Sequence, residues 1–165
     1  MFVVDTNVLV YAADEDSPFH ARCREQVEQW RRQPGAWYVT WGILYEFLRV
    51  TTHPRVMRRP WSGPDAWRFV AALLASPGLD VLAPTDRHPA VAEQVFLEVP
   101  QLVGNLVHDA HTAILMREHG IRRIVTRDTD RVLTSFKKLG FLLPGADLEL
   151  LRKAEQEMFD RFWGK

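Results

Sequence analysis

The chain has 165 residues, of which 47% are hydrophobic, and its 21 basic side chains (Lys and Arg) balance its 21 acidic ones (Asp and Glu). This size and composition favour one domain with one hydrophobic core and exclude an intrinsically disordered chain, while the zero net charge means that any surface for nucleic acid must be local. The single cysteine, Cys23, excludes a disulfide framework within the chain, and no stretch reaches the roughly 20 apolar residues that a membrane span requires.

Short apolar runs alternate with amphipathic segments along the chain. The first run, Phe2–Val4, predicts a buried strand, and Thr6 or Asn7 can cap the helix that follows it. Ser17-Pro18 is typical of a helix start and predicts a second helix that ends at Pro34-Gly35. We expect further strands at 37–39, 79–82 and 123–126, and further helices after Thr40 and over 65–75, 89–98, 105–119, 128–136 and 146–163. Each strand–helix unit is long enough for a right-handed crossover, so the pattern predicts an α/β fold with a parallel sheet covered on both faces.

Acidic residues occur at points where a strand gives way to a helix or on the inward face of a helix. They are Asp5, Glu46, Asp109 and the pair Asp128 and Asp130. An unpaired carboxylate in an apolar stretch costs on the order of several kcal/mol, so each must be protonated, be paired or bind a cation. Ligands of open parallel sheets collect at the carboxyl ends of the strands, where Asp5 and the segment 126–130 lie. Several carboxylates without a histidine partner favour Mg²⁺ or Mn²⁺ over zinc, which predicts a site for phosphodiester chemistry.

Polar residues accompany these acids in the sequence, namely Thr6, Asn7, Asn105 and Thr126. Asn105 shares a helix face with Asp109, and either threonine can hydrogen-bond the attacking water or an acidic ligand. A purely structural role is also open to each acid. Asp5, Asp128 and Asp130 can each cap a helix, and an arginine can satisfy Glu46 or Asp109. It is the joint occurrence of these acids that indicates a site.

Candidate contacts to an RNA strand are less specific. Arginines expected near the rim of the pocket are Arg49, Arg55, Arg58, Arg59 and Arg127. The six tryptophans can stack bases, and Trp61, in the loop that contains Arg58 and Arg59, is the one expected at a substrate or partner surface. Cys23 is expected to be buried and inert. The opening residues are not typical of a signal peptide, because Asp5 interrupts the apolar run, so a cytoplasmic location is expected.

The chain resembles the PIN-domain ribonucleases, in particular the VapC toxins of type II toxin–antitoxin pairs. Four ordered motifs carry the resemblance, at Val4–Ala12, Trp41–Val50, Gly104–Ala113 and Thr126–Asp130. It covers residues 1 to about 143. The resemblance implies a three-layer α/β/α sandwich with a nuclease domain at 1–143, and we expect residues 144–165 to form a C-terminal helical extension packed on the same domain.

The resemblance also implies an activity and partners. It implies Mg²⁺- or Mn²⁺-dependent endonucleolytic cleavage of RNA, a homodimer, and a cognate antitoxin that blocks the active site. By motif, the metal-binding acids are Asp5, Glu46, Asp109 and Asp128, with Asp130 as an outer member. Proteins recognise the bases of an RNA most easily where it is single-stranded, so a tRNA or rRNA loop is the expected target. Two alternatives are an RNA- or protein-binding module with an inactive site, and an aspartate-nucleophile phosphatase, against which Asn7 counts because that chemistry usually has a second acid there.

Overall fold

A parallel four-stranded sheet organises the chain. The structure is a computed structural model that describes residues 1–33, 35–104 and 106–127, and in these ranges it has four strands and six helices. In chain order they are β1 (Phe2–Val4), α1 (Thr6–Ala13), α2 (His20–Arg32), β2 (Trp37–Thr40), α3 (Trp41–Thr51), α4 (Gly63–Leu74), β3 (Leu79–Leu82), α5 (His88–Glu98), α6 (Leu106–Glu118) and β4 (Ile124–Val125). The helices expected over 128–136 and 146–163, and the domain boundary expected at 143, lie outside the described residues.

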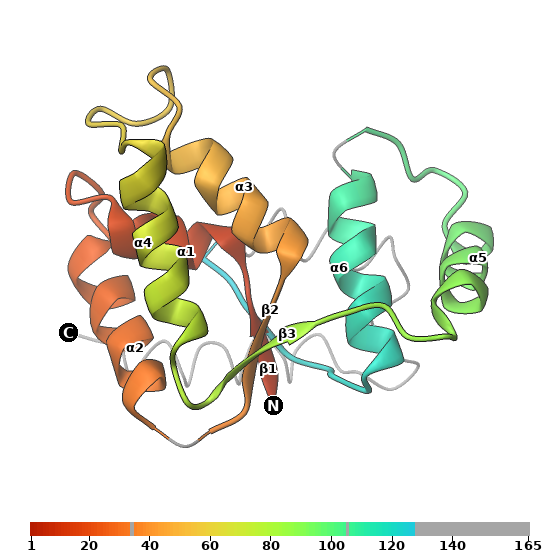
Figure 1. Cartoon of the computed structure of the whole chain (residues 1–165). Helices are drawn as coiled ribbons and strands as arrows, with labels where there is room; N and C mark the ends of the chain where they lie inside the picture. The colour runs from red at the N-terminus through yellow and green to blue at the C-terminus, as the bar shows by residue number, and fades with distance from the viewer. Residues whose placement is uncertain (34, 105, 128–165) are drawn as a thin grey trace.

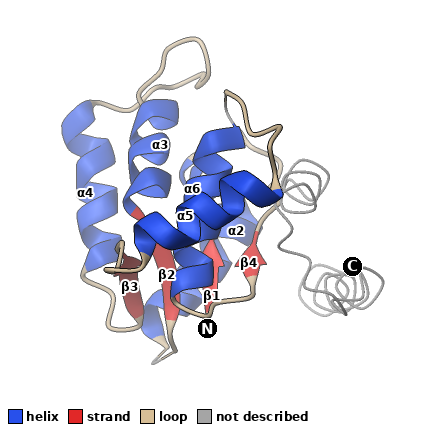
Figure 2. Ribbon diagram, turned by 90° about the vertical axis from the view of Figure 1, so that its right-hand side faces the viewer, coloured by secondary structure: helices blue, strands red, loops and turns tan. Residues whose placement is uncertain are grey.

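The strand order is β3-β2-β1-β4, and every pairing is parallel. The chain steps from β1 to β2 to β3 in one direction and then crosses to β4 on the other side of β1. Because crossovers between parallel strands are right-handed, the change of direction puts α1–α4 on one face of the sheet and α5 and α6 on the other (Figures 1 and 2). The expected sandwich of helices around a parallel sheet is therefore confirmed.

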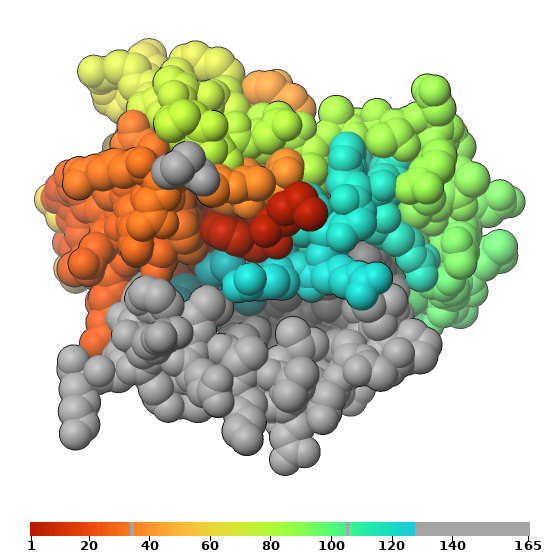
Figure 3. Space-filling view, turned by 90° about the horizontal axis from the view of Figure 1, so that it is seen from below, coloured from red at the N-terminus to blue at the C-terminus, as the bar shows by residue number. Residues whose placement is uncertain are grey.

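This topology also predicts where a ligand binds. The strand order reverses between β1 and β4, and open parallel sheets bind ligands at such a reversal, outside the carboxyl ends of the strands. Val4 is paired with Val125 at these ends, so the residues that follow both strands begin side by side. Figure 3 shows the opposite end of the molecule, where the strands begin and the N-terminal residues lie between the α2–β2 and α6–β4 segments.

Two groups of buried apolar side chains fill the layers. The larger group lies between the sheet and α1–α4, includes Trp37 and Phe47, and extends to Leu115 and Met116 of α6. The smaller group joins α5 to α6 and contains Val95, Val99, Leu102, Ala110, Ala113 and Ile114. Glu118, at the end of α6, carries an acidic group into the buried part of the described chain, with an exposure of 7%. None of the helices in the described part of the chain is long and apolar enough to cross a membrane.

Most element boundaries agree with those expected from the sequence, and one differs for a clear reason. Thr40 caps α3, because its hydroxyl accepts a hydrogen bond from the Ile43 N–H group at 3.1 Å. The second helix begins at His20 rather than at Ser17-Pro18. Ser17 instead forms a turn, in which its hydroxyl accepts from the Phe19 N–H and its carbonyl from the His20 N–H. Gly120 ends α6 with a φ of 65°, as expected for a glycine stop.

Candidate active site

Asp5 lies where β1 ends and α1 begins. Its backbone is extended, and its Oδ1 accepts a hydrogen bond from the Thr6 N–H group at 2.7 Å. Its Oδ2 accepts from the hydroxyl of Thr126, at the end of β4, at 2.9 Å. The carboxylate is therefore both the helix cap that the sequence allowed and a link between the ends of two neighbouring strands.

Asn7 completes this link between the first and last described strands. Its Nδ2 donates to the Thr126 hydroxyl at 2.8 Å, and its Oδ1 accepts from the Arg127 N–H group at 3.1 Å. The Thr126 hydroxyl thus accepts from Asn7 and donates to Asp5, which fixes the direction of its hydrogen. The sequence predicted that the residues after the first and last strands meet, and the structure places them in direct contact.

Glu46 reaches the same place from α3. Its Oε2 accepts a hydrogen bond from the Thr6 hydroxyl at 2.9 Å, and its Oε1 lies 3.6 Å from Nη2 of Arg49. Its side chain is 44% exposed, so the expectation that Glu46 lies on the inward, apolar face of its helix is wrong. Those neighbours, Leu44 and Phe47 among them, turn inward on the helix and leave Glu46 at the surface of the site.

Burial raises the pKa of Asp5 from 3.8 to about 6. The hydrogen bonds from Thr126 and Thr6 oppose this rise, while the negative charges of Glu46 and Asp109 add to it. Asp109, half-buried in the first turn of α6, therefore lies close enough to act on Asp5 across the sheet edge. The acids predicted from separate segments repel one another at one edge of the sheet, as expected of a site that binds a cation.

The chemistry of these side chains suits a hard divalent cation. Asp5, Glu46 and Asp109 supply carboxylate oxygens, the ligands that Mg²⁺ and Mn²⁺ prefer. A bound cation would offset the repulsion from Glu46 and Asp109, which adds to the effect of burial on the pKa of Asp5. Within residues 1–33, 35–104 and 106–127, no three side chains of His, Cys, Asp or Glu lie close enough to form a complete metal site. The predicted site residues Asn105, Asp128 and Asp130 lie outside these ranges.

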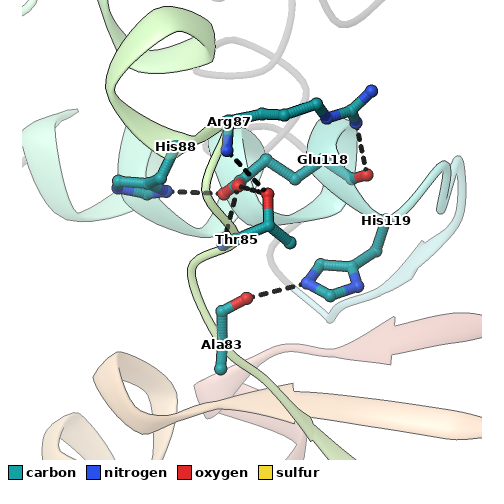
Figure 4. Close-up of polar contacts among 6 residues, drawn as sticks. All are labelled: Ala83, Thr85, Arg87, His88, Glu118 and His119. Carbon is teal, nitrogen blue, oxygen red and sulfur yellow. Dashed lines mark hydrogen bonds and ion pairs between the residues drawn. The ribbon is translucent and has the colours of Figure 1, made fainter.

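A second acidic centre, at Glu118, was missed by the sequence analysis. Its side chain is fully buried, and its Oε1 accepts from the N–H and hydroxyl of Thr85 at 3.0 and 2.6 Å (Figure 4). Its Oε2 lies 2.5 Å from Nδ1 of His88, and its backbone carbonyl accepts from Arg87. Burial acts to raise the pKa of Glu118, but these donors outweigh burial and the pKa lies below its usual value. The only signal in the sequence was an acid two residues after the apolar run Ala113–Met116.

Three other side chains singled out in the sequence pack in the core or form ion pairs with neighbouring residues. Trp61 packs edge-on against Phe47 and Phe69, with ring centroids 6.2 and 5.7 Å away, so it covers the core. Arg59 forms ion pairs with Glu15 and Asp16. Cys23 is buried as expected, and burial raises the pKa of its thiol to about 11.

Comparison with known proteins agrees with this arrangement. The PIN domain family matches residues 2–142, which is most of the chain. The chain belongs to the PIN-domain family.

Relatives with curated names point to one branch of that family. Ribonuclease VapC48 of Mycobacterium tuberculosis is 34% identical over 126 residues, which cover 76% of this chain and 86% of the relative. Ribonuclease VapC43 of the same organism is 35% identical over 144 residues, covering 87% and 95%. Ribonuclease VapC37 is 32% identical over 130 residues, covering 79% and 89%. Within the PIN-domain family, the chain is thus similar to proteins named VapC ribonucleases over nearly their whole length.

Proposed function

We propose that this chain is a metal-dependent endoribonuclease and the toxin of a toxin–antitoxin pair, acting in the cytoplasm. The observation that supports it most is the hydrogen bonding of Asp5 and Glu46 by Thr6, and of Asp5 by Thr126, at the strand-order reversal. Burial raises the pKa of Asp5 there, and the charges of Glu46 and Asp109 add to the rise. Membership of the PIN-domain family and similarity to proteins named ribonucleases support the same activity.

Each residue of the site has a role in this proposal. Asp5, Glu46 and Asp109, together with Asp128 and with Asp130 as an outer member, hold Mg²⁺ or Mn²⁺ beside the scissile phosphodiester. When bound, the divalent cation supplies positive charge against the charge that develops on the phosphate. The protein contributes orientation. Thr126 and the Thr6 N–H group hold the two oxygens of Asp5, and the Thr6 hydroxyl holds Glu46.

The supporting amides keep the two strand ends in register. Asn7 bonds both Thr126 and Arg127, so the segment after β4 cannot shift without breaking hydrogen bonds. Asn105 is proposed to support Asp109 from the same helix face. The phosphatase alternative is disfavoured by Asn7, which stands where that chemistry usually has a second acid and which bonds Thr126 and Arg127 instead.

The partners of this activity are proposals as well. The substrate is an RNA read in a single-stranded region, such as a tRNA or rRNA loop. A cognate antitoxin covers the acidic site, and the chain acts as a homodimer.

The direct test is RNA cleavage by purified variants in Mn²⁺. Asp5→Asn and Asp109→Asn each keep the size of the side chain but remove the charge that holds the cation, so we expect cleavage to fall by about 10³-fold or more, on the scale of losing one essential electrostatic group. Asp80→Asn, an exposed acid on β3, is the matched control and should retain activity. Far-ultraviolet circular dichroism checks that each variant is folded. Full cleavage by folded Asp5→Asn would overturn the assignment.

A further inference from the structure

Two aromatic side chains on α3 lie in the same helical turns as Glu46 and are not part of the buried core. Trp41 is 43% exposed and Tyr45 is 64% exposed, and their ring centroids are 5.9 Å apart at an interplanar angle of 38°. Being four residues apart, they lie on one face of the helix. The tilted contact holds each ring against the other and leaves ring surface open to solvent.

The helix places this pair at the rim of the acidic site. Gly42 follows Trp41 in the chain, and Glu46 follows Tyr45. Both lie on the side of α3 that faces the site. Glu46 accepts a hydrogen bond from Thr6, and a Cβ atom on Gly42 would lie 3.6 Å from Nδ1 of His111 on α6. Trp41 and Tyr45 therefore occupy the neighbouring, solvent-facing side of the same two turns.

A cationic side chain continues this surface. Arg49 lies one turn beyond Tyr45, is 65% exposed at its side chain, and has its guanidinium 3.6 Å from Glu46. Open aromatic rings beside an exposed guanidinium suit a single-stranded nucleic acid, whose bases stack and whose phosphates pair with arginine.

We propose that Trp41 and Tyr45 form a stacking platform for an unpaired base of the RNA, next to the phosphodiester that is cleaved. This inference rests on the proposed ribonuclease function and adds positioning residues to it. Stacking on this platform would fix where a strand crosses the acids, with Arg49 contacting the adjoining phosphate. Since every base has a flat face, the platform favours single-stranded over paired RNA rather than one sequence over another.

The test measures binding, so that it can fail separately from catalysis. A fluorescein-labelled 12-mer of uridines and a matching 12-mer without bases are titrated with the full chain in Ca²⁺, and fluorescence anisotropy gives each Kd. Trp41→Ala and Tyr45→Ala should each weaken binding of the uridine strand roughly tenfold, within the range that loss of one stacked base gives. The strand without bases should bind the wild type and both variants equally weakly. Tyr45→Phe should retain binding, because it keeps the ring.

Trp67 provides a matched control. It is an exposed tryptophan on α4, at 46% exposure, and Trp67→Ala should leave both Kd values unchanged. Unchanged binding of the uridine strand by Trp41→Ala would overturn the platform, as would an equal loss for both strands. Self-association that is lost in Trp41→Ala, with RNA binding intact, would assign the surface to a second copy of the chain and also overturn it. If RNA cleavage depends on Asp5 but Trp41→Ala changes neither cleavage nor RNA binding, the platform is overturned and the nuclease proposal stands. If the chain binds RNA through its bases but does not cleave it, the nuclease proposal is overturned and the platform stands.

Discussion

The two acidic centres of this molecule differ in what surrounds them. Glu118 is enclosed by donors, with Thr85 on one carboxylate oxygen and His88 on the other (Figure 4). Asp5 also receives two hydrogen bonds, but it faces the carboxylates of Glu46 and Asp109. The donors of Glu118 outweigh its burial and lower its pKa, whereas burial, with a smaller contribution from the neighbouring carboxylates, raises the pKa of Asp5 to about 6.

On the proposed function, this difference separates an acid that holds the fold together from an acid that takes part in catalysis. The hydrogen bonds of Glu118 fix the start of α5 to the end of α6, and the charge is satisfied within the protein. On the proposed function, the negative charges of Glu46 and Asp109, which add to the pKa of Asp5, are a repulsion that a bound cation would relieve. A buried acid with a shifted pKa is therefore not by itself diagnostic of function.

The largest effect on stability is expected at Glu118. Glu118→Ala leaves the donors of Thr85 and His88 without their buried acceptor, and we expect a loss of about 3 kcal/mol in the free energy of unfolding. Glu98→Ala removes an exposed pair with Arg117 and is the control, with an expected cost below about 1 kcal/mol. Urea denaturation at pH 7 measures both. Equal costs would mean that the Glu118 centre does not hold α5 to α6.

Replacing Asp5 should stabilise the metal-free protein, whereas replacing Glu118 should destabilise it. Because its folded pKa of about 6 exceeds the ordinary 3.8, its ionisation opposes folding, and the stability that the protonated form contributes is lost as pH rises through about 6. Asp5→Asn removes that charge, so at pH 8 the variant should be more stable than wild type by up to about 3 kcal/mol. At pH 4 the gain should nearly vanish. Urea denaturation across this pH range in chelator would contradict the account if the variant were destabilised at pH 8.

The contribution of Glu118 to stability should depend on pH in the acidic range. A lowered folded pKa means that Glu118 contributes stability above its ordinary value of 4.5 and loses it as pH falls through the folded pKa. Wild-type protein should therefore lose stability on acidification below about pH 4.5 more steeply than Glu118→Gln, which has no charge to protonate. Thermal unfolding between pH 3 and 6 measures the two slopes. Parallel slopes would mean that Glu118 is not held ionised by its donors.

A smaller effect is expected at Thr126. Thr126→Val removes the hydroxyl that donates to Asp5 and accepts from Asn7, at an expected cost of about 1 kcal/mol. Because that hydrogen bond lowers the pKa of Asp5, the pKa should rise further above 6 in the variant. Carboxyl-carbon NMR titration of Asp5 measures it directly. An unchanged or lower pKa would show that Thr126 does not hold the charged form.

The sequence predicted the fold where local patterns decide it. The runs at Phe2–Val4 and Leu79–Leu82 and the cap at Thr40 are local signals, and they appear as expected. The contact between Asp5 and Thr126 was also foreseeable, since parallel strands end at one edge. The strand order was not foreseeable, because it depends on pairings between distant segments. Nor were the Glu118 hydrogen bonds, since Thr85 lies 33 residues away in the chain.

The exposure of side chains was the least predictable property. Glu46 sits among apolar residues in sequence and is half-exposed in the fold, because helical rotation separates it from them. Trp61 stands in a loop rich in arginine and nevertheless packs on Phe47. Trp41 begins a helix that buries Leu44 and Phe47, but Trp41 itself is exposed. Tertiary packing determines the exposure of these side chains, and it cannot be inferred from their neighbours in the sequence.

Stabilisation by a divalent cation tests the central claim most directly. Mn²⁺ at about 100 times its Kd should add about 2.7 kcal/mol to the free energy of unfolding of the wild-type chain, because the cation binds the folded acids. The same addition should do little for Asp5→Asn or Asp109→Asn and should add the full amount to Glu118→Gln. An equal gain from Mn²⁺ in wild type and Asp5→Asn would contradict the account, since the cation would then bind elsewhere.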